Sequence, residues 1–362
     1  MVNEQTVLDL LYTKKNVLLM GAPGTGKSKI MNDVAAIFEG VQGAIANPVH
    51  IPTAAIPIPA HRGTLPILGA RNRKVFRTTL HQNSKYRDFL TGITPAIGNT
   101  DGYQINEGIL YRANEYAKQP DSAALLIIDE LNRGPAIEVF GGSIVAIESD
   151  KRLAPDNSIL PTTQFFEITS PVDGRMEEYA FSPNLYILAA MNQADVSVAP
   201  LDVAFLRRWH AEKLHPQYDV LYGKFSVPLD AVLPNECNTA TDVFNVAINA
   251  LRKINATISI GRGEDYQLGQ GVFLSTQPRG GSKEEALRFV AEAWNMIYAH
   301  IEELFFGDCT AIAYIVNANS ERSPYHTEEK SFAGETKIIL RHEEISTANI
   351  FDLYLAIAGR ET

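Results

Sequence analysis

The sequence predicts an α/β fold in which helices cover both faces of a parallel central sheet and a mainly helical region follows. Three observations lead to this prediction. Short, continuous apolar runs alternate with segments of helical periodicity up to about residue 215. A glycine-rich turn joins the first of these runs to the first strongly periodic segment. From about His215 onwards amphipathic stretches dominate, so we expect an α/β domain over 1–215 and a mainly helical domain over 216–362.

The first elements surround the glycine-rich turn. After a short amphipathic opening, the apolar run 17–20 is typical of a buried strand, and apolar residues at helical spacing predict a helix over 29–38. The turn between them fits the pattern G-x-x-x-x-G-K-[ST] in full. It consists of Gly21, Ala22, Pro23, Gly24, Thr25, Gly26, Lys27 and Ser28.

A strand, a glycine-rich turn and a helix in this order direct backbone N–H groups and a helix N-terminus at a polyphosphate. We therefore predict that the loop binds a nucleotide. Lys27 would reach the β- and γ-phosphates, and the hydroxyl of Ser28 would bind Mg²⁺.

The remaining elements follow in order along the chain. A proline-rich connection over 48–66 cannot be regular helix. We then expect strands over 75–80, 124–128 and 185–190, helices over 109–117 and 137–148, a helix beginning at Tyr86, and a hairpin over about 165–181. Helices are expected over 242–258, 283–306 and 346–358, whereas 317–335 is polar and is expected to lack regular structure.

Charge is unevenly distributed along the chain. The net charge of −10 argues against a protein that coats nucleic acid with its whole surface. The segment 41–87 nevertheless has seven Arg and Lys residues and no Asp or Glu, and it includes a proline-rich, basic insertion at about 41–74. Either its cations pair with carboxylates elsewhere in the chain, or it forms a local surface for DNA or an acidic partner.

Cysteine usage and hydropathy indicate a cytoplasmic protein without a membrane span. Cys237 and Cys309 form no close-spaced metal-binding pattern, and two thiols suit a reducing cytosol. Neither a signal sequence nor an apolar run of about 18 residues is present. Because the first strand begins by Asn16, we expect no separate N-terminal DNA-reading domain, and any reading of modified bases to belong to another chain.

A second candidate site element follows the buried strand 124–128. This strand ends in Asp129 and Glu130, which places two carboxylates at the C-terminal edge of a parallel sheet, where ligands bind. Asp129 would hold Mg²⁺ directly or through water. Glu130 would polarise the water that attacks the γ-phosphate.

Two further elements complete the candidate site. Asn192 follows the strand 185–190, and its neutral amide is suited to orient the attacking water. Arg207 and Arg208 lie close to the expected domain boundary. They would either stabilise transition-state charge on the nucleotide of a neighbouring subunit or anchor the helical domain as surface residues.

These four elements, in this order, resemble the AAA+ superfamily, where they are called Walker A, Walker B, sensor 1 and arginine finger. A narrower resemblance is visible in residues 81–95, HQNSKYRDFLTGITP, which look like a signature of the McrB family, the motor subunits of modification-dependent restriction systems. Residues 105–121, 127–134 and 191–202 continue this resemblance, and 265–273, DYQLGQGVF, is similar to the family's lid motif. The resemblance covers roughly residues 14 to 310.

The resemblance implies a P-loop AAA+ three-layer sandwich with a helical lid, which assembles into a homo-oligomeric, hexameric ring with active sites between subunits. It also implies Mg²⁺, ATP or GTP as substrate, a McrC-like nuclease subunit as partner, and DNA contacted through the assembly. Arg133 matches the family's Asn-Arg after the Walker B carboxylates, and Asp195 matches the last residue of its Asn-Thr-Ala-Asp. The chain departs from the family at Gln193, where Thr is usual, and at Leu206, where a third arginine is frequent.

Two other functions stay open at this point. One is a MoxR- or dynein-like AAA+ ATPase that remodels protein partners without DNA. The other is a scaffold that binds nucleotide in order to assemble and hydrolyses it slowly. The choice between ATP and GTP is also open, because no residue that reads the base is recognisable.

Overall fold

A computed structural model describes residues 2–40, 69–96, 102–194, 201–274 and 281–360. These residues pack as two units that meet in the chain between Leu214 and His215. The short segment Ala22–Gly26 of the glycine-rich loop packs with the second unit. The proline-rich part of the expected basic insertion, up to residue 68, lies outside the described residues.

The first unit contains a five-stranded sheet with the order β2-β5-β8-β1-β9. All four strand pairs are parallel, which confirms the predicted α/β sheet. The edge strand β9 was not predicted, because its sequence, His-Ala-Glu-Lys-Leu, lacks the apolar run of a central strand. The strands are β1 (Asn16–Gly21), β2 (Asn72–Thr79), β5 (Ser122–Asp129), β8 (Leu185–Met191) and β9 (His210–Leu214).

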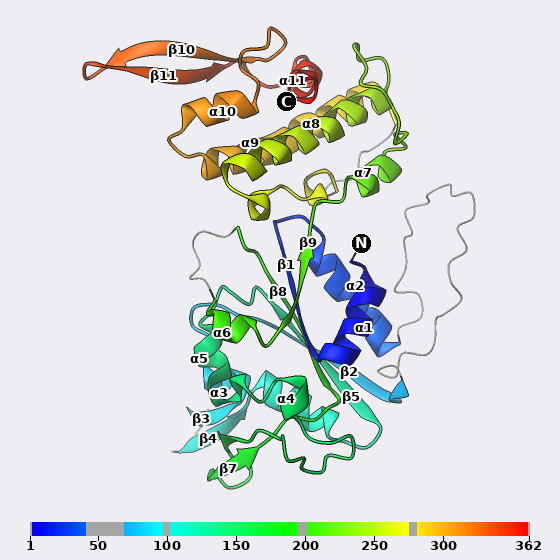
Figure 1. Cartoon of the computed structure of the whole chain (residues 1–362), viewed down its shortest axis with the longest axis vertical. Helices are drawn as coiled ribbons and strands as arrows, with labels where there is room; N and C mark the ends of the chain where they lie inside the picture. Colours follow the sequence, from blue (N-terminus) through cyan, green and yellow to red (C-terminus); the bar gives the residue numbers. More distant parts are fainter. Residues whose placement is uncertain (1, 41–68, 97–101, 195–200, 275–280, 361–362) are drawn as a thin grey trace. The chain divides into compact units, whose positions relative to one another are not determined.

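Helices cover both faces of this sheet (Figure 1). Leu125 and Ile127 of β5 pack in one core with α1 (Glu4–Lys14) and α2 (Lys27–Glu39). Their neighbours Leu126 and Ile128 point to the opposite face and pack in a second core with α4 (Ile109–Ala117) and α5 (Ala136–Phe140). Since side chains alternate across a strand and both faces are buried, the middle residues of the central strands are apolar on both faces.

The expected helix over 137–148 is wrong in its length. Helix α5 ends at Phe140, and the 3₁₀ turn η2 (Gly141–Ile144) follows. Gly141 has a φ of 51°, and a Cβ there would lie 2.7 Å from the ring of Tyr86. The close approach of this ring and the left-handed backbone end the helix, although the apolar spacing continues beyond it.

Two hairpins extend the first unit beyond the sheet. Strands β6 (Phe166–Thr169) and β7 (Met176–Tyr179) form the hairpin expected at about 165–181. The expected helix at Tyr86 is the single turn α3 (Tyr86–Phe89), and an unpredicted hairpin of β3 (Thr91–Pro95) and β4 (Tyr103–Glu107) follows it. The hydroxyl of Thr91 accepts a hydrogen bond from the backbone N–H of Thr169, so the two hairpins are joined.

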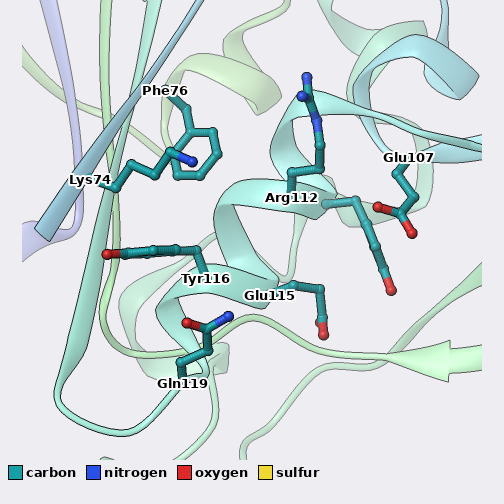
Figure 2. A pocket seen from close by; sticks show the side chains of 8 residues that line it. Lys74, Phe76, Glu107, Arg112, Glu115, Tyr116 and Gln119 are labelled. Carbon is teal, nitrogen blue, oxygen red and sulfur yellow. The ribbon is translucent and has the colours of Figure 1, made fainter. Parts of the chain in front are cut away.

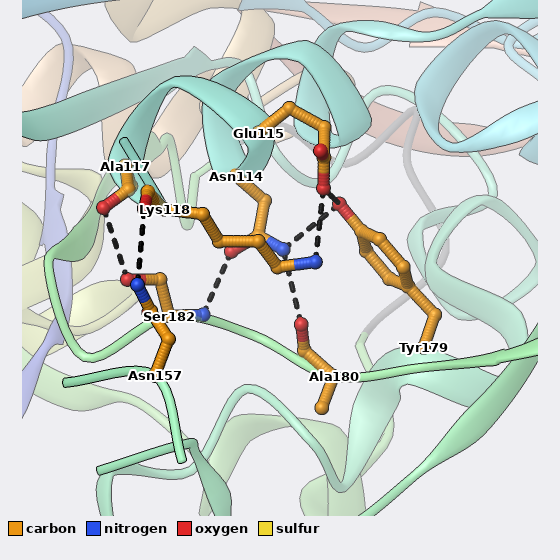
Figure 3. Close-up of polar contacts among 8 residues, drawn as sticks. All are labelled: Asn114, Glu115, Ala117, Lys118, Asn157, Tyr179, Ala180 and Ser182. Atoms are coloured by element: carbon orange, nitrogen blue, oxygen red, sulfur yellow. Dashed lines mark hydrogen bonds and ion pairs between the residues drawn. The ribbon is translucent and has the colours of Figure 1, made fainter. Parts of the chain in front are cut away.

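A buried polar network connects α4 to the chain that leads from β7 into β8 (Figure 3). The side-chain amide of Asn114 donates to the hydroxyl of Tyr179 and to the carbonyl of Ala180, while its oxygen accepts from the backbone N–H of Ser182. The hydroxyl of Tyr179 donates to Glu115 over 2.7 Å. Burial raises the pKa of Tyr179 well above its usual value, so this phenol stays a donor at neutral pH. The network fixes the start of β8, whose far end carries Asn192.

The second unit is mainly helical. Its core is formed by α7 (Tyr218–Lys224), α8 (Ala240–Gly261), α9 (Lys283–Leu304), α10 (Cys309–Ile315) and α11 (Ile350–Ala358). Helix α8 begins with a capping box, in which Thr239 and Asp242 each bond the backbone N–H of the other. No helix in the described ranges is long and apolar enough to cross a membrane.

The expectation that 317–335 lacks regular structure is wrong. Strands β10 (Tyr325–Phe332) and β11 (Glu335–His342) form a hairpin with eight residue pairs. Its two-residue turn, Ala333 and Gly334, has φ values of 54° and 85°, as a tight hairpin turn requires. Both strands are mostly exposed and polar, so hydropathy gave no indication of them.

Candidate active site

The glycine-rich loop lies between the end of β1 at Gly21 and the start of α2 at Lys27. Gly24 and Gly26 have φ values of 77° and 99°, which favour glycine. The hydroxyl of Thr25 donates to the carbonyl of Ala22 over 2.9 Å and thereby closes the turn. The loop has the strand–turn–helix setting that the sequence predicts for a phosphate cradle.

Lys27 is a buried cation at the start of α2. The residue is only 8% exposed, and its ammonium donates a hydrogen bond to the carbonyl of Gly21 over 2.7 Å. Burial lowers the pKa of Lys27 to about 8, and the carboxylates of Glu130 and Asp129 oppose this decrease. The ammonium is thus mostly protonated at neutral pH and lies close enough to both acids to interact with them.

Ser28 and Asp129 line the same pocket, which has a volume of about 250 Å³. Asp129 ends β5 and is paired in register with Thr79 of β2, which also lines this pocket. A hydroxyl and a carboxylate are hard oxygen ligands that fit Mg²⁺, which commonly binds through one or two carboxylates together with phosphates and water. Within the described ranges no group of three or more His, Cys, Asp or Glu residues is placed to hold a metal by itself. The hydroxyl of Ser28 and the carboxylate of Asp129 fit a Mg²⁺ ion whose other ligands are phosphate and water oxygens.

Glu130 is held on both of its carboxylate oxygens. The Nε atom of Arg133 lies 3.2 Å from Oε2, and the amide of Asn192 donates to Oε1 over 3.3 Å. Asn132 in turn donates to the backbone carbonyl of Asn192 over 2.8 Å. Glu130 itself has a φ of 53°, which is uncommon for a residue with a side chain and is typical of functional positions.

The parallel sheet brings these groups together. Strands β5 and β8 are neighbours, so Glu130 and Asn192, which follow their C-terminal ends, meet at one edge. A carboxylate next to a neutral amide is suited to hold a water molecule and to accept its proton. Ser28 and Asp129 thus share a pocket, Glu130 contacts Asn192 and Arg133, and Lys27 interacts electrostatically with Glu130 and Asp129.

The two candidate finger arginines have different surroundings. Arg208 is mostly buried, and its Nε lies 3.2 Å from Oε1 of Glu148 without hydrogen-bond geometry. Its Nη1 donates to the carbonyl of Ala204. Arg207 follows α6 (Val203–Leu206), is exposed, and forms no side-chain hydrogen bond or ion pair with any residue in the described part of the chain. Arg208 is thus held by residues of its own α/β unit, which is neither a surface position nor an anchor of the helical domain, whereas the exposed side chain of Arg207 fits the finger alternative. Asp195 lies outside the described residues.

Basic side chains in the described part of the segment 41–87 contact other residues of this chain. Arg71 pairs with Asp121 over 3.4 Å, and Arg77 donates to Asn32 over 3.0 Å. The ammonium of Lys74 lies 5.1 Å from the ring centre of Phe76, in a surface pocket that also contains carboxylates of α4 and β4 (Figure 2). Arg71 thus fits the first alternative, pairing with a carboxylate of its own chain, while Arg77 and Lys74 contact an amide and an aromatic ring.

Sequence reasoning did not single out Gln270. This residue opens the 3₁₀ turn η5 (Gln270–Phe273), and its amide donates to the carbonyl of Thr25 in the glycine-rich loop over 3.1 Å. The available signal was the pair of glycines on either side, Gly269 and Gly271, within the segment that resembles a lid motif.

Comparison with known proteins gives the following relatives. Residues 65–209 match the AAA domain (dynein-related subfamily), a range that includes Asp129, Glu130, Asn192 and both arginines but not the glycine-rich loop. The chain is 29% identical over 216 residues to the Type IV methyl-directed restriction enzyme EcoKMcrB subunit of Escherichia coli (strain K12), covering 59% of this chain and 38% of that protein. It is 28% identical over 215 residues to the Type II restriction enzyme BsuMI component YdiS of Bacillus subtilis (strain 168), covering 55% of this chain and 57% of that protein. The match thus spans less than two thirds of either relative.

Similar solved structures include a putative ATPase from Cytophaga hutchinsonii and PCH-2 from C. elegans. The first has a TM-score of 0.34 and 13% identity, with 96% of this chain and 86% of that chain covered. The second has a TM-score of 0.32 and 12% identity, with 81% and 67% covered.

Proposed function

We propose that this chain, which is McrB-like and matches an AAA domain, hydrolyses a nucleoside triphosphate where the C-terminal ends of β5 and β8 meet, and that it drives a McrC-like nuclease subunit in the restriction of foreign DNA. The observation that supports hydrolysis best is Glu130, whose two carboxylate oxygens contact Arg133 and Asn192 beside the Asp129 pocket. Both relatives are parts of restriction enzymes, one a subunit and the other a component, which supports the restriction role.

In this proposal the residues of the loop and the sheet edge divide the work. Lys27 neutralises charge on the β- and γ-phosphates, and Ser28 and Asp129 hold Mg²⁺, which supplies further charge neutralisation when it is bound. Glu130 accepts a proton from the attacking water as the new bond to the γ-phosphorus forms and the bond to the β–γ bridging oxygen breaks. Asn192 orients that water and Glu130 by hydrogen bonding. The products are the nucleoside diphosphate and inorganic phosphate.

The finer parts of the proposal concern the assembly. Arg207 stabilises transition-state charge on the nucleotide of a neighbouring subunit, which requires a homo-oligomer, and a hexameric ring is the expected form. DNA is contacted through the assembled complex. The substrate is ATP or GTP, and both belong in the first assays.

A second candidate function is the remodelling of protein partners without DNA. The observation that favours it is the family match itself, whose description names a dynein-related subfamily. A scaffold that hydrolyses nucleotide slowly is less well supported, because Lys27, Asp129, Glu130 and Arg207 are all retained.

Hydrolysis of ATP and GTP with Mg²⁺, with and without the McrC-like partner and DNA, tests the proposal. We expect Glu130→Gln to lower turnover at least about 100-fold while nucleotide binding survives, because the amide cannot accept the proton. Glu138→Gln, an acid on α5, is the matched control and should leave turnover unchanged. Full turnover in Glu130→Gln would exclude Glu130 as the catalytic carboxylate, and stimulation by protein partners alone would favour remodelling.

A further inference from the structure

Three successive carbonyl groups of the glycine-rich loop are bound by one tripeptide of the second unit. The backbone N–H of Gly269 donates to the carbonyl of Pro23 over 3.0 Å, and the N–H of Gly271 donates to that of Gly24 over 2.8 Å. The side-chain amide of Gln270 donates to the third, the carbonyl of Thr25, over 3.1 Å. The loop segment Ala22–Gly26 and the tripeptide belong to the same packed unit.

The two glycines are required by space and not by their backbone angles. A Cβ on Gly269 would lie 2.1 Å from the carbonyl carbon of Gly24, and one on Gly271 would lie 2.8 Å from its Cα. These are backbone atoms that cannot move away as a flexible side chain would. Glycine on both sides of Gln270 is thus what allows the two backbones to approach closely enough to bond.

Gln270 is itself fixed at both ends of its amide. The residue is 6% exposed, and its Oε1 accepts from the backbone N–H of Gln217 over 3.0 Å. An amide has one accepting end and one donating end, so this contact turns the donating NH₂ group toward Thr25.

The tripeptide stands on a rigid support. Asn255 of α8, which is 1% exposed, donates to the carbonyl of Leu268 over 2.8 Å and accepts from its N–H over 2.7 Å. This double hydrogen bond ties the residue before Gly269 to α8. The segment 268–271 is thus held independently of the loop that it contacts.

We propose that Gln270, together with its flanking glycines, is a positioning residue that orients the phosphate-binding N–H groups of the loop. Within a planar trans peptide the carbonyl of one residue and the N–H of the next point in opposite directions. Fixing the carbonyls of Pro23, Gly24 and Thr25 therefore aims the N–H groups of the next three residues, Gly24, Thr25 and Gly26, away from the tripeptide. Phosphate then binds amides that are already aligned, and this inference rests on the proposed binding of a nucleotide at the loop.

The test measures nucleotide binding to the full chain by titration calorimetry, with Mg²⁺ and either ATP or GTP on the Glu130→Gln background. Gln270→Met keeps the side-chain length and removes both hydrogen bonds, and we expect it to weaken binding of both di- and triphosphate by about tenfold. Gln267→Met is the matched control, because the amide of Gln267 donates to Ser259 and not to the loop. It should leave binding unchanged.

A second variant keeps the inference testable if Gln270→Met does not fold. Gln270→Glu can still accept from the N–H of Gln217 but cannot donate to Thr25, so it should weaken binding at least as much. In turnover assays with Glu130 intact, both variants should raise KM with little change in kcat, because ground state and transition state lose the same contact. In the absence of nucleotide, the loop amides of both Gln270 variants should also exchange their hydrogens faster than those of the parent protein.

The outcomes separate the two claims. If the parent protein binds neither ATP nor GTP, both the proposed function and the positioning role of Gln270 are excluded. If the parent binds and the Gln270 variants bind equally well with unchanged loop exchange, only the positioning role is overturned. A lower kcat at unchanged KM would likewise contradict it.

Discussion

The amide nitrogen of Asn192 lies 3.3 Å from Oε1 of Glu130, although the two residues follow different strands of the sheet. The pairing of β5 with β8 creates this contact, since both strands run parallel and end at the same edge. A neutral amide bound to the candidate base can orient it without changing its charge. Asn192 is therefore placed to affect the chemical step more than nucleotide binding.

Replacement of Asn192 tests this placement. We expect Asn192→Ala to lower kcat about 10- to 100-fold with a KM close to the parent value, because water and Glu130 lose their orientation only in the reacting complex. Steady-state hydrolysis over a range of nucleotide concentrations measures both parameters. Asn106→Ala is the control, as that amide donates to the carbonyl of Arg87 in another part of the unit. An increase in KM alone would assign Asn192 to binding.

The different surroundings of Arg207 and Arg208 lead to a second prediction. Arg207→Ala should abolish the hydrolysis that is stimulated by the McrC-like partner and DNA. It should not change the free energy of unfolding, since its side chain is exposed. Arg208→Ala should instead lower that free energy by about 1–3 kcal/mol, because it leaves Glu148 without its partner at a mostly buried site. Urea unfolding and hydrolysis assays on the same samples distinguish the two effects.

A mixing experiment shows whether Arg207 acts across subunits. Arg207→Ala and Glu130→Gln are each inactive in this scheme, but a mixed assembly contains some interfaces with an intact Glu130 and an intact Arg207. Partial recovery of hydrolysis on mixing is the expected result. No recovery, in mixtures shown by native mass spectrometry to exchange subunits, would place Arg207 in its own subunit's site or outside catalysis.

The contacts of Arg208 illustrate which parts of the site were predictable from sequence. The central strands were predicted because burial on both faces makes their sequences apolar. The glycine-rich loop and the pair Asp129–Glu130 could be placed because each lies at the C-terminal end of such a strand. Arg207 and Arg208 are adjacent and chemically identical, so their roles depend on Glu148, which only the fold brings near. Strand β9 and Gln270 were missed for a related reason, because their partners are distant in sequence. Hairpin β10–β11 pairs locally, but its strands are mostly exposed and polar and therefore have no hydropathy signal.

Lys27 leads to a prediction about pH. Its pKa is lowered to about 8, so without nucleotide an increasing fraction of the side chain is neutral as the pH rises through 8. Bound phosphates favour the ammonium and raise this pKa, so binding takes up protons near and above pH 8 and weakens as the pH increases further. Calorimetry in two buffers of different ionisation enthalpy should show proton uptake at pH 8.5 and almost none from Lys27 at pH 6.5. Equal uptake in Lys27→Met would assign the protons to another group.

Arg152 provides the last prediction, which concerns the stability of the sheet that carries the site. Its side chain is 1% exposed, and burial lowers its pKa to about 9. The guanidinium donates to the carbonyls of Ile147 and Leu185 and, over 2.7 Å, to Oδ1 of Asn16. Since Asn16 begins β1 and Leu185 begins β8, this side chain joins the starts of two adjacent strands.

Arg152→Met should lower the free energy of unfolding by about 3 kcal/mol, because several buried acceptors lose their donor while the side-chain volume is largely kept. Lys151→Met is the matched control on the preceding residue. Its ion pair with Asp150 is exposed, so the loss should be below about 1 kcal/mol. Urea unfolding of both variants measures the difference. Equal stability of the two would mean that the carbonyls at the starts of β1 and β8 find other donors, and that the ends of these strands do not depend on Arg152.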